Sequence, residues 1–84
     1  MTKIKSCKVK KANAWLFNEY GTDKIVVEHY GVKIAVLCNG VLKVYNKGGG
    51  ITASDARAIS QATGLVVTRK NGDVQCLGAK IERF

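Results

Sequence analysis

The chain has 84 residues, of which 46% are apolar and 24% charged, so it is not an intrinsically disordered chain and is predicted to form one small β-rich domain over residues 1–84. Fourteen Lys and Arg against six Asp and Glu leave a net charge of +8. This excess favours an anionic partner, namely nucleic acid, a nucleoprotein or an acidic protein face, although lysines that only keep a small sheet protein soluble are the simpler alternative.

Cysteine usage and hydropathy predict a reducing, cytoplasmic location. Cys7, Cys38 and Cys76 are an odd number without C-x-x-C spacing, so neither a disulfide framework nor a structural zinc site is expected. No segment approaches the run of about 20 apolar residues that spans a bilayer. The N-terminal lysines are not followed by the hydrophobic stretch of a signal peptide, so no membrane partner is expected.

The first predicted element, residues 3–11 (KIKSCKVKK), is an edge strand with a bulge or a frayed arm. It has no acidic residue and holds five of the eight net charges, on Lys3, Lys5, Lys8, Lys10 and Lys11. Lysines protect an edge strand from aggregation, but one or two suffice. The alternative is an arm that contacts phosphates, because ammonium groups bind the nucleic-acid backbone without reading its sequence.

Residues 13–20 (NAWLFNEY) form the next predicted strand, in which Trp15 and Phe17 share one face. Core packing is the first interpretation for a domain this small, and a platform for bases or a protein beside the lysines is the alternative. A turn at 20–23 leads to a strand at 24–29. Its last residue, His29, is the only histidine and is expected to be a structural or surface residue.

The central predicted element is a hairpin over 32–46, in which Asn39-Gly40 predicts a two-residue type I′ turn. The turn pairs Cys38 with Val41 and fixes the register of both strands. Both faces of this hairpin are then apolar, and one helix covers only one of them. The other face would be covered by curling of the sheet, by a second subunit of a homodimer or by a partner. The interaction residues expected on that face are Val32, Val36, Lys43 and Tyr45.

A helix is predicted over 53–63. Thr52 and Asp55 form the capping-box pattern at its start, and Gly64 allows a left-handed cap at its end. The Gly-rich segment 47–50 before it resembles no phosphate-binding motif, although Lys47 could join a basic surface. A second hairpin turns at Asn71-Gly72 and contributes Arg69 and Lys70 to that surface, and KIERF ends as a short strand.

The fold class that follows is α+β, a curled antiparallel β-sheet in the order β-β-β-β-α-β-β with one packed helix. No catalytic constellation, metal site or cofactor motif is recognisable, so the protein is predicted not to be an enzyme. The first function hypothesis is binding of nucleic acid or a nucleoprotein through the lysine-rich segment. A protein-binding inhibitor that acts through the exposed sheet face or an edge is the alternative, and a small ligand-binding or sequestering protein is the second alternative.

The passage YGVKIAVLCNGVLKVYNKGGGITASDARAI resembles the short accessory proteins that bacteriophages encode. Such proteins often block host machinery, including restriction and CRISPR complexes, so the resemblance implies an anti-defence inhibitor in the host cytoplasm. Many inhibitors of this kind imitate DNA and are acidic. This chain is basic, which favours an acidic protein face or the nucleic acid within a complex as its target, and the resemblance assigns no residue a role.

Overall fold

The computed structural model describes residues 2–6, 8–45, 51–70 and 73–83. Five strands precede one helix and three follow it in these ranges, so the predicted α+β class is confirmed, with more strands on each side of the helix than the predicted order contains. The elements are β1 Thr2–Ser6, β2 Ala12–Glu19, β3 Thr22–His29, β4 Val32–Cys38, β5 Val41–Val44, α1 Ala53–Thr63, β6 Val66–Lys70, β7 Asp73–Leu77 and β8 Lys80–Arg83.

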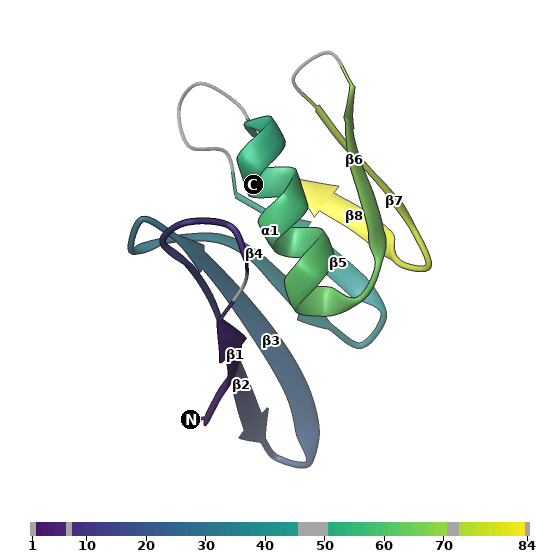
Figure 1. Ribbon diagram of the computed structural model, residues 1–84. Coiled ribbons are helices and arrows are strands. Elements are labelled where there is room, and N and C mark those ends of the chain that lie inside the picture. Colours follow the sequence, from purple (N-terminus) through teal and green to yellow (C-terminus); the bar gives the residue numbers. More distant parts are fainter. Residues whose placement is uncertain (1, 7, 46–50, 71–72, 84) are drawn as a thin grey trace.

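Six of the strands form one sheet in the order β1-β2-β3-β4-β5-β8, and β6 with β7 forms a separate hairpin. Strands β1 to β5 are antiparallel neighbours, whereas β8 pairs with β5 in parallel. The sheet is therefore mixed rather than purely antiparallel. The cause is the long connection, because the chain leaves β5, passes through α1 and the β6–β7 hairpin, and returns beside β5 in the same direction (Figure 1).

Three two-residue turns connect β2 to β5, at Tyr20-Gly21, Tyr30-Gly31 and Asn39-Gly40. Both residues of each turn have positive φ, between 52° and 78°. This is the type I′ geometry, whose twist matches that of the flanking strands. The predicted Asn39-Gly40 hairpin is confirmed, whereas the Asn71-Gly72 turn and Lys47–Gly50 lie outside the described residues.

The predicted hairpin register is also confirmed, with Cys38 opposite Val41 and Leu37 opposite Leu42. One residue departs from simple alternation. The pairing of β3 with β4 shifts between Val27 and Glu28, so that Ile34 has no partner of its own on β3. This β-bulge changes the parity of the strand, and Ile34 is fully buried in the core instead of lying on the far face of the hairpin.

Helix α1 has the predicted bounds and caps. The side chain of Thr52 accepts from the N–H of Asp55 at 3.1 Å, and Asp55 Oδ2 accepts from the N–H of Thr52 at 3.1 Å. Gly64 closes the other end with φ 76° and donates to the carbonyl of Ser60. The residues of α1 that face the sheet are small apart from Ile59, so the helix lies close to the strands.

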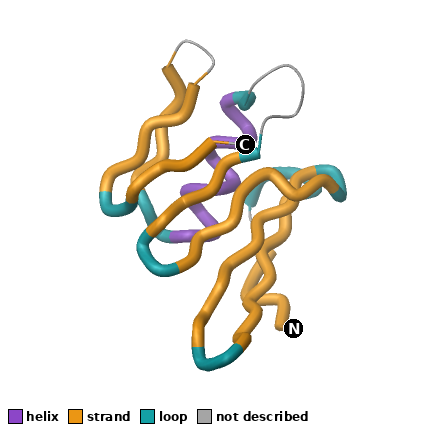
Figure 2. Tube along the Cα trace, turned by 180° about the vertical axis from the view of Figure 1, so that it is seen from behind, coloured by secondary structure: helices purple, strands orange, loops and turns teal. Residues whose placement is uncertain are grey.

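The core lies between α1 and one face of the sheet, and Val67 and Val74 of the β6–β7 hairpin extend it. Seen from the back, the strands lie in front of the helix (Figure 2), so α1 covers a single face. The main core residues on the covered face are Ala14, Val27, Ala35, Leu42 and Val44. No helix of the described part of the chain has both the length and the apolar character needed to cross a membrane.

Candidate nucleic-acid interface

The sheet face that points away from α1, here called the open face, carries the first candidate site. Its residues alternate with the core residues along β2 to β5, and the register places them side by side. No described element packs on them as a second layer. The open face consists of Asn13, Trp15, Phe17, Lys24, Val26, Glu28, Lys33, Val36, Cys38, Val41, Lys43 and Tyr45, and β8 adds Glu82 opposite Lys43.

A hollow of about 430 Å³ lies in the middle of the open face. Val26, Val36 and Cys38 form its floor, and Lys24, Lys33 and Lys43 contribute three cations to its lining. None of its nine lining residues is acidic. The hollow therefore combines an apolar base with three cations in its lining, and Glu28 and Glu82 lie opposite Lys33 and Lys43 in the register, outside that lining.

Long side chains shield the floor of the hollow from water. Val26 is 8% exposed and Val36 5% exposed, although no second layer covers them. Lysine stems cover apolar surface well while the ammonium group stays in water. The Lys33 Nζ atom lies 4.8 Å from the centre of the Tyr45 ring, and the Lys24 Nζ atom lies 5.9 Å from the centre of the Phe17 ring. Both distances lie in the cation–π range, so each of these two lysines lies next to an aromatic ring of the open face.

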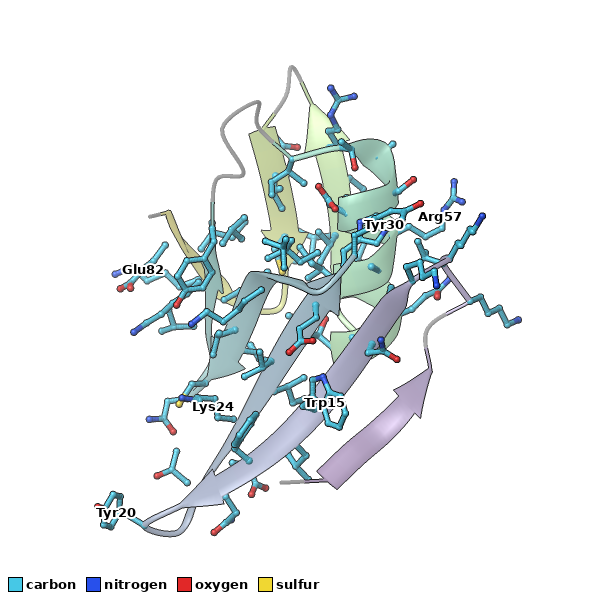
Figure 3. The ribbon with its side chains drawn as sticks, turned by 90° about the vertical axis from the view of Figure 1, so that its left-hand side faces the viewer. Trp15, Tyr20, Lys24, Tyr30, Arg57 and Glu82 are labelled. Atoms are coloured by element: carbon cyan, nitrogen blue, oxygen red, sulfur yellow. The ribbon has the colours of Figure 1, made fainter. Side chains whose placement is uncertain are left out.

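Trp15 and Phe17 are half-buried members of the open face and lie outside the buried core cluster. They do share one face of β2, as predicted, but that face is not the one covered by α1 (Figure 3). The core-packing interpretation is therefore wrong for both rings. Among the described residues, the buried indole Nε1 of Trp15 has no hydrogen-bond partner.

Two exposed tyrosines occupy turn positions that favour other residues. Tyr20 has φ 53° and is fully exposed at the end of the open face, where it also lines the hollow. Tyr30 has φ 54° and is 61% exposed. Bulky residues are rare at positive φ, where Asn is preferred, as Asn39 shows in the third turn. The two tyrosines are therefore held in conformations that their own side chains disfavour.

We expect a Tyr20→Asn variant to be more stable than the parent chain. The left-handed conformation costs an ordinary residue roughly 1–2 kcal/mol, and Asn relieves part of this, so the free energy of unfolding should rise by about 0.5 kcal/mol. Denaturant unfolding measures the change. The mirror variant, Asn39→Tyr, should lose a similar amount, and an equal or lower stability of Tyr20→Asn would show that the tyrosine ring makes a compensating contact.

The second candidate site, here called the basic patch, consists of Lys8, Lys10, Lys11 and Arg57, all exposed. The three lysines lie in the connection between β1 and β2. Its backbone is fixed at both ends, because the N–H of Lys8 donates to Gln61 Oε1 at 2.8 Å and the N–H of Tyr30 donates to the Lys11 carbonyl at 2.9 Å.

Arg57 joins the basic patch through helix geometry. It lies one turn before Gln61 and so shares its helix face. Figure 3 shows Arg57 and Tyr30 at the same end of the molecule. A shallow hollow of about 370 Å³ between α1 and β6 connects Arg57 to Arg69, whose Nε donates to the Ile51 carbonyl at 2.7 Å. Arg69 therefore extends the positive surface along the helix.

The sequence-predicted lysines fall into different settings. Lys8, Lys10 and Lys11 are exposed together in the basic patch, whereas the backbone of Lys3 and Lys5 pairs with Trp15 and Ala14 on the edge strand β1. The register of β1 shifts between Lys3 and Lys5, as predicted for an edge strand with a bulge. Lys47 and the side chain of Lys70 lie outside the described residues.

Three of the four predicted interaction residues, Val36, Lys43 and Tyr45, line the hollow of the open face. Val32 does not. Because of the bulge at Ile34, Val32 pairs with His29 and lies near the exposed turn, 47% exposed. The same change of parity brings Lys33 onto the open face, a residue that alternation assigned to the opposite side.

A buried hydrogen bond between His29 and Asp55 supports the end of the sheet that carries the basic patch. His29 is 4% exposed, Asp55 is fully buried, and the Nδ1 atom of His29 lies 2.5 Å from Oδ1 of Asp55. The other carboxylate oxygen accepts from the helix cap. This pair therefore fixes β3 to the first turn of α1.

No family model, curated protein or solved structure matches this chain. Within the described ranges no three His, Cys, Asp or Glu side chains gather as a metal site would require.

Sequence reasoning missed Arg57, Lys24 and Lys33 as site residues. Arg57 had a usable signal, since it lies on the helix face opposite the core residues. Lys24 alternates with Ile25 and Val27 along β3, which also places it away from the core. Lys33 had no such signal, because its side depends on the bulge.

Proposed function

We propose that this chain is a non-enzymatic nucleic-acid-binding protein that contacts phosphates through the basic patch. The observation that carries the proposal is the joint exposure of Lys8, Lys10 and Lys11 on a loop attached to α1 beside Arg57. The net charge of +8 also attracts a polyanion such as nucleic acid over long distances.

The fixed backbone of this loop favours binding. Two hydrogen bonds, from the N–H of Lys8 and to the carbonyl of Lys11, hold the loop in place before a ligand arrives. A preorganised loop loses less conformational entropy on association than a free arm does. Lysine side chains contact phosphates as point charges, so this surface should bind many sequences with similar affinity.

The test compares two variants of equal net charge. Lys8→Gln/Lys10→Gln removes two cations of the basic patch, and Lys80→Glu lowers the net charge by the same two units at an exposed position on β8. We expect the first variant to reduce the slope of log K against log salt by about 1.4 for a single strand, because each phosphate contact contributes about 0.7. Fluorescence anisotropy with labelled mixed-sequence DNA and RNA, titrated with salt, measures both slopes.

The control variant should keep most of the slope. Equal losses in the two variants would show that only net charge matters and would reject the basic patch as the contact surface. Absence of binding to DNA and RNA at low salt would reject nucleic acid altogether. An acidic protein face, as the resemblance to phage inhibitors implies, would then be the partner to seek by affinity capture.

A further inference from the structure

The open face has a chemistry that the basic patch lacks. The basic patch offers exposed cations, which suit the phosphates of any nucleic acid, whereas the open face places cations around an apolar hollow with aromatic neighbours. In a duplex the bases are paired and stacked and cannot enter such a hollow. Unpaired nucleotides expose both the flat faces of their bases and their phosphates.

We propose that the open face is a second site, which binds unpaired nucleotides and makes the protein prefer single strands to duplexes. A base would displace the lysine stems that cover Val26 and Val36 and lie on this apolar floor, beside the ring of Tyr45. The phosphates on either side of that base would contact Lys24 and Lys33. This proposal rests on the proposed function, because it adds base binding to a protein that already attracts the backbone.

Size and charge agree with this occupant. A hollow of about 430 Å³ lies within the range of small-molecule pockets, roughly 300–1,000 Å³. Its three lysines and the absence of acidic lining residues match an anion. An acidic peptide would match the charge, but it would not use the rings of Phe17, Tyr45 and Tyr20, which can stack on bases.

Tyr20 gives this site an exposed aromatic edge. Its side chain is fully exposed and lines the same hollow as Lys24 and Lys33. A base leaving the hollow along the strand direction would meet this ring. The strained turn conformation of Tyr20 is consistent with a residue retained for contact and not for stability.

The experiment measures anisotropy with a labelled 15-nucleotide single strand and with the matching duplex. Lys24→Gln/Lys33→Gln alters the open face and Lys8→Gln/Lys10→Gln alters the basic patch, with equal loss of charge. Lys43 is retained because it makes a further contact within the protein. We expect the open-face variant to lose at least about fivefold in single-strand affinity and less than about twofold in duplex affinity, and Tyr20→Ala to change in the same direction. The basic-patch variant should weaken both.

The outcomes separate the two proposals. If the parent chain binds neither probe, the proposed function fails. If it binds both equally, or if the open-face variant loses single strand and duplex alike, only the present inference fails. Tight binding of polyglutamate that the open-face variant abolishes would also overturn it, since charge alone would then explain the site.

A second readout needs no change to the lysines. Cys38 lines the hollow, so its reaction with a maleimide reports occupancy in a Cys7→Ser/Cys76→Ser background. We expect the single strand to slow this reaction several-fold and the duplex to leave it unchanged. An unchanged rate with a saturating single strand would overturn the proposal, even if the lysine variants failed to fold.

Discussion

An Asp55→Ala variant should lose about 2–4 kcal/mol of the free energy of unfolding. Asp55 is fully buried and satisfies two donors at once, the imidazole of His29 and the N–H of Thr52. Removing the carboxylate leaves the His29 donor buried without a partner, which costs about 1–3 kcal/mol. Loss of the reciprocal cap adds about 1 kcal/mol. Denaturant unfolding followed by circular dichroism measures the total.

Two controls divide this loss into its parts. Thr52→Ala removes the cap and leaves the His29 contact, so it should cost only about 1 kcal/mol. A His29→Leu/Asp55→Ala double variant removes both members of the pair and should recover part of the loss, because no buried donor remains unpaired. If Asp55→Ala proved no worse than Thr52→Ala, the pair would contribute nothing to stability.

An Ile34→Ala variant is expected to lose about 2–5 kcal/mol, as large-to-small changes in well-packed cores do. Ile34 is fully buried and belongs to the core cluster. Strict alternation along β4 would instead place it on the open face with Val36. The size of the loss therefore tests the β-bulge directly.

Val32 is the matched control, because alternation gives it the same side as Ile34 while the structure leaves it 47% exposed. Val32→Ala should change the unfolding free energy by less than about 0.5 kcal/mol. Similar losses in the two variants would contradict the bulge. Unfolding curves recorded under identical conditions suffice for the comparison.

Local signals in the sequence predicted much of the fold. Asn39-Gly40 determined both the turn and the register of the central hairpin, since a type I′ turn permits one pairing. Thr52, Asp55 and Gly64 determined the bounds of α1 through its caps. The parallel pairing of β8 with β5 had no local signal, because it depends on how a long connection packs.

The candidate site was less predictable because it too depends on how segments far apart in the sequence pack together. The exposure of Lys8, Lys10 and Lys11 followed from their charge, whereas the hydrogen bond that attaches Lys8 to Gln61 of α1 did not follow from the sequence. The hollow of the open face depends on the bulge at Ile34, which decides that Lys33 and not Val32 lies on that face. His29 and Asp55 are far apart in the sequence. The strand pattern around His29 and the capping pattern around Asp55 did not indicate that the two side chains meet.

The parallel pairing of β5 with β8 has a consequence for the order of events during folding. Contacts among β1 to β5 join neighbours in the sequence and can form on the microsecond timescale typical of hairpins. The β5–β8 pairing closes a long loop and must follow later, since loop closure has an entropic cost before any contact rewards it. During that interval β5 is an unprotected edge beside the uncovered side chains of Leu42 and Val44, so a nascent chain is most prone to pair with another chain there.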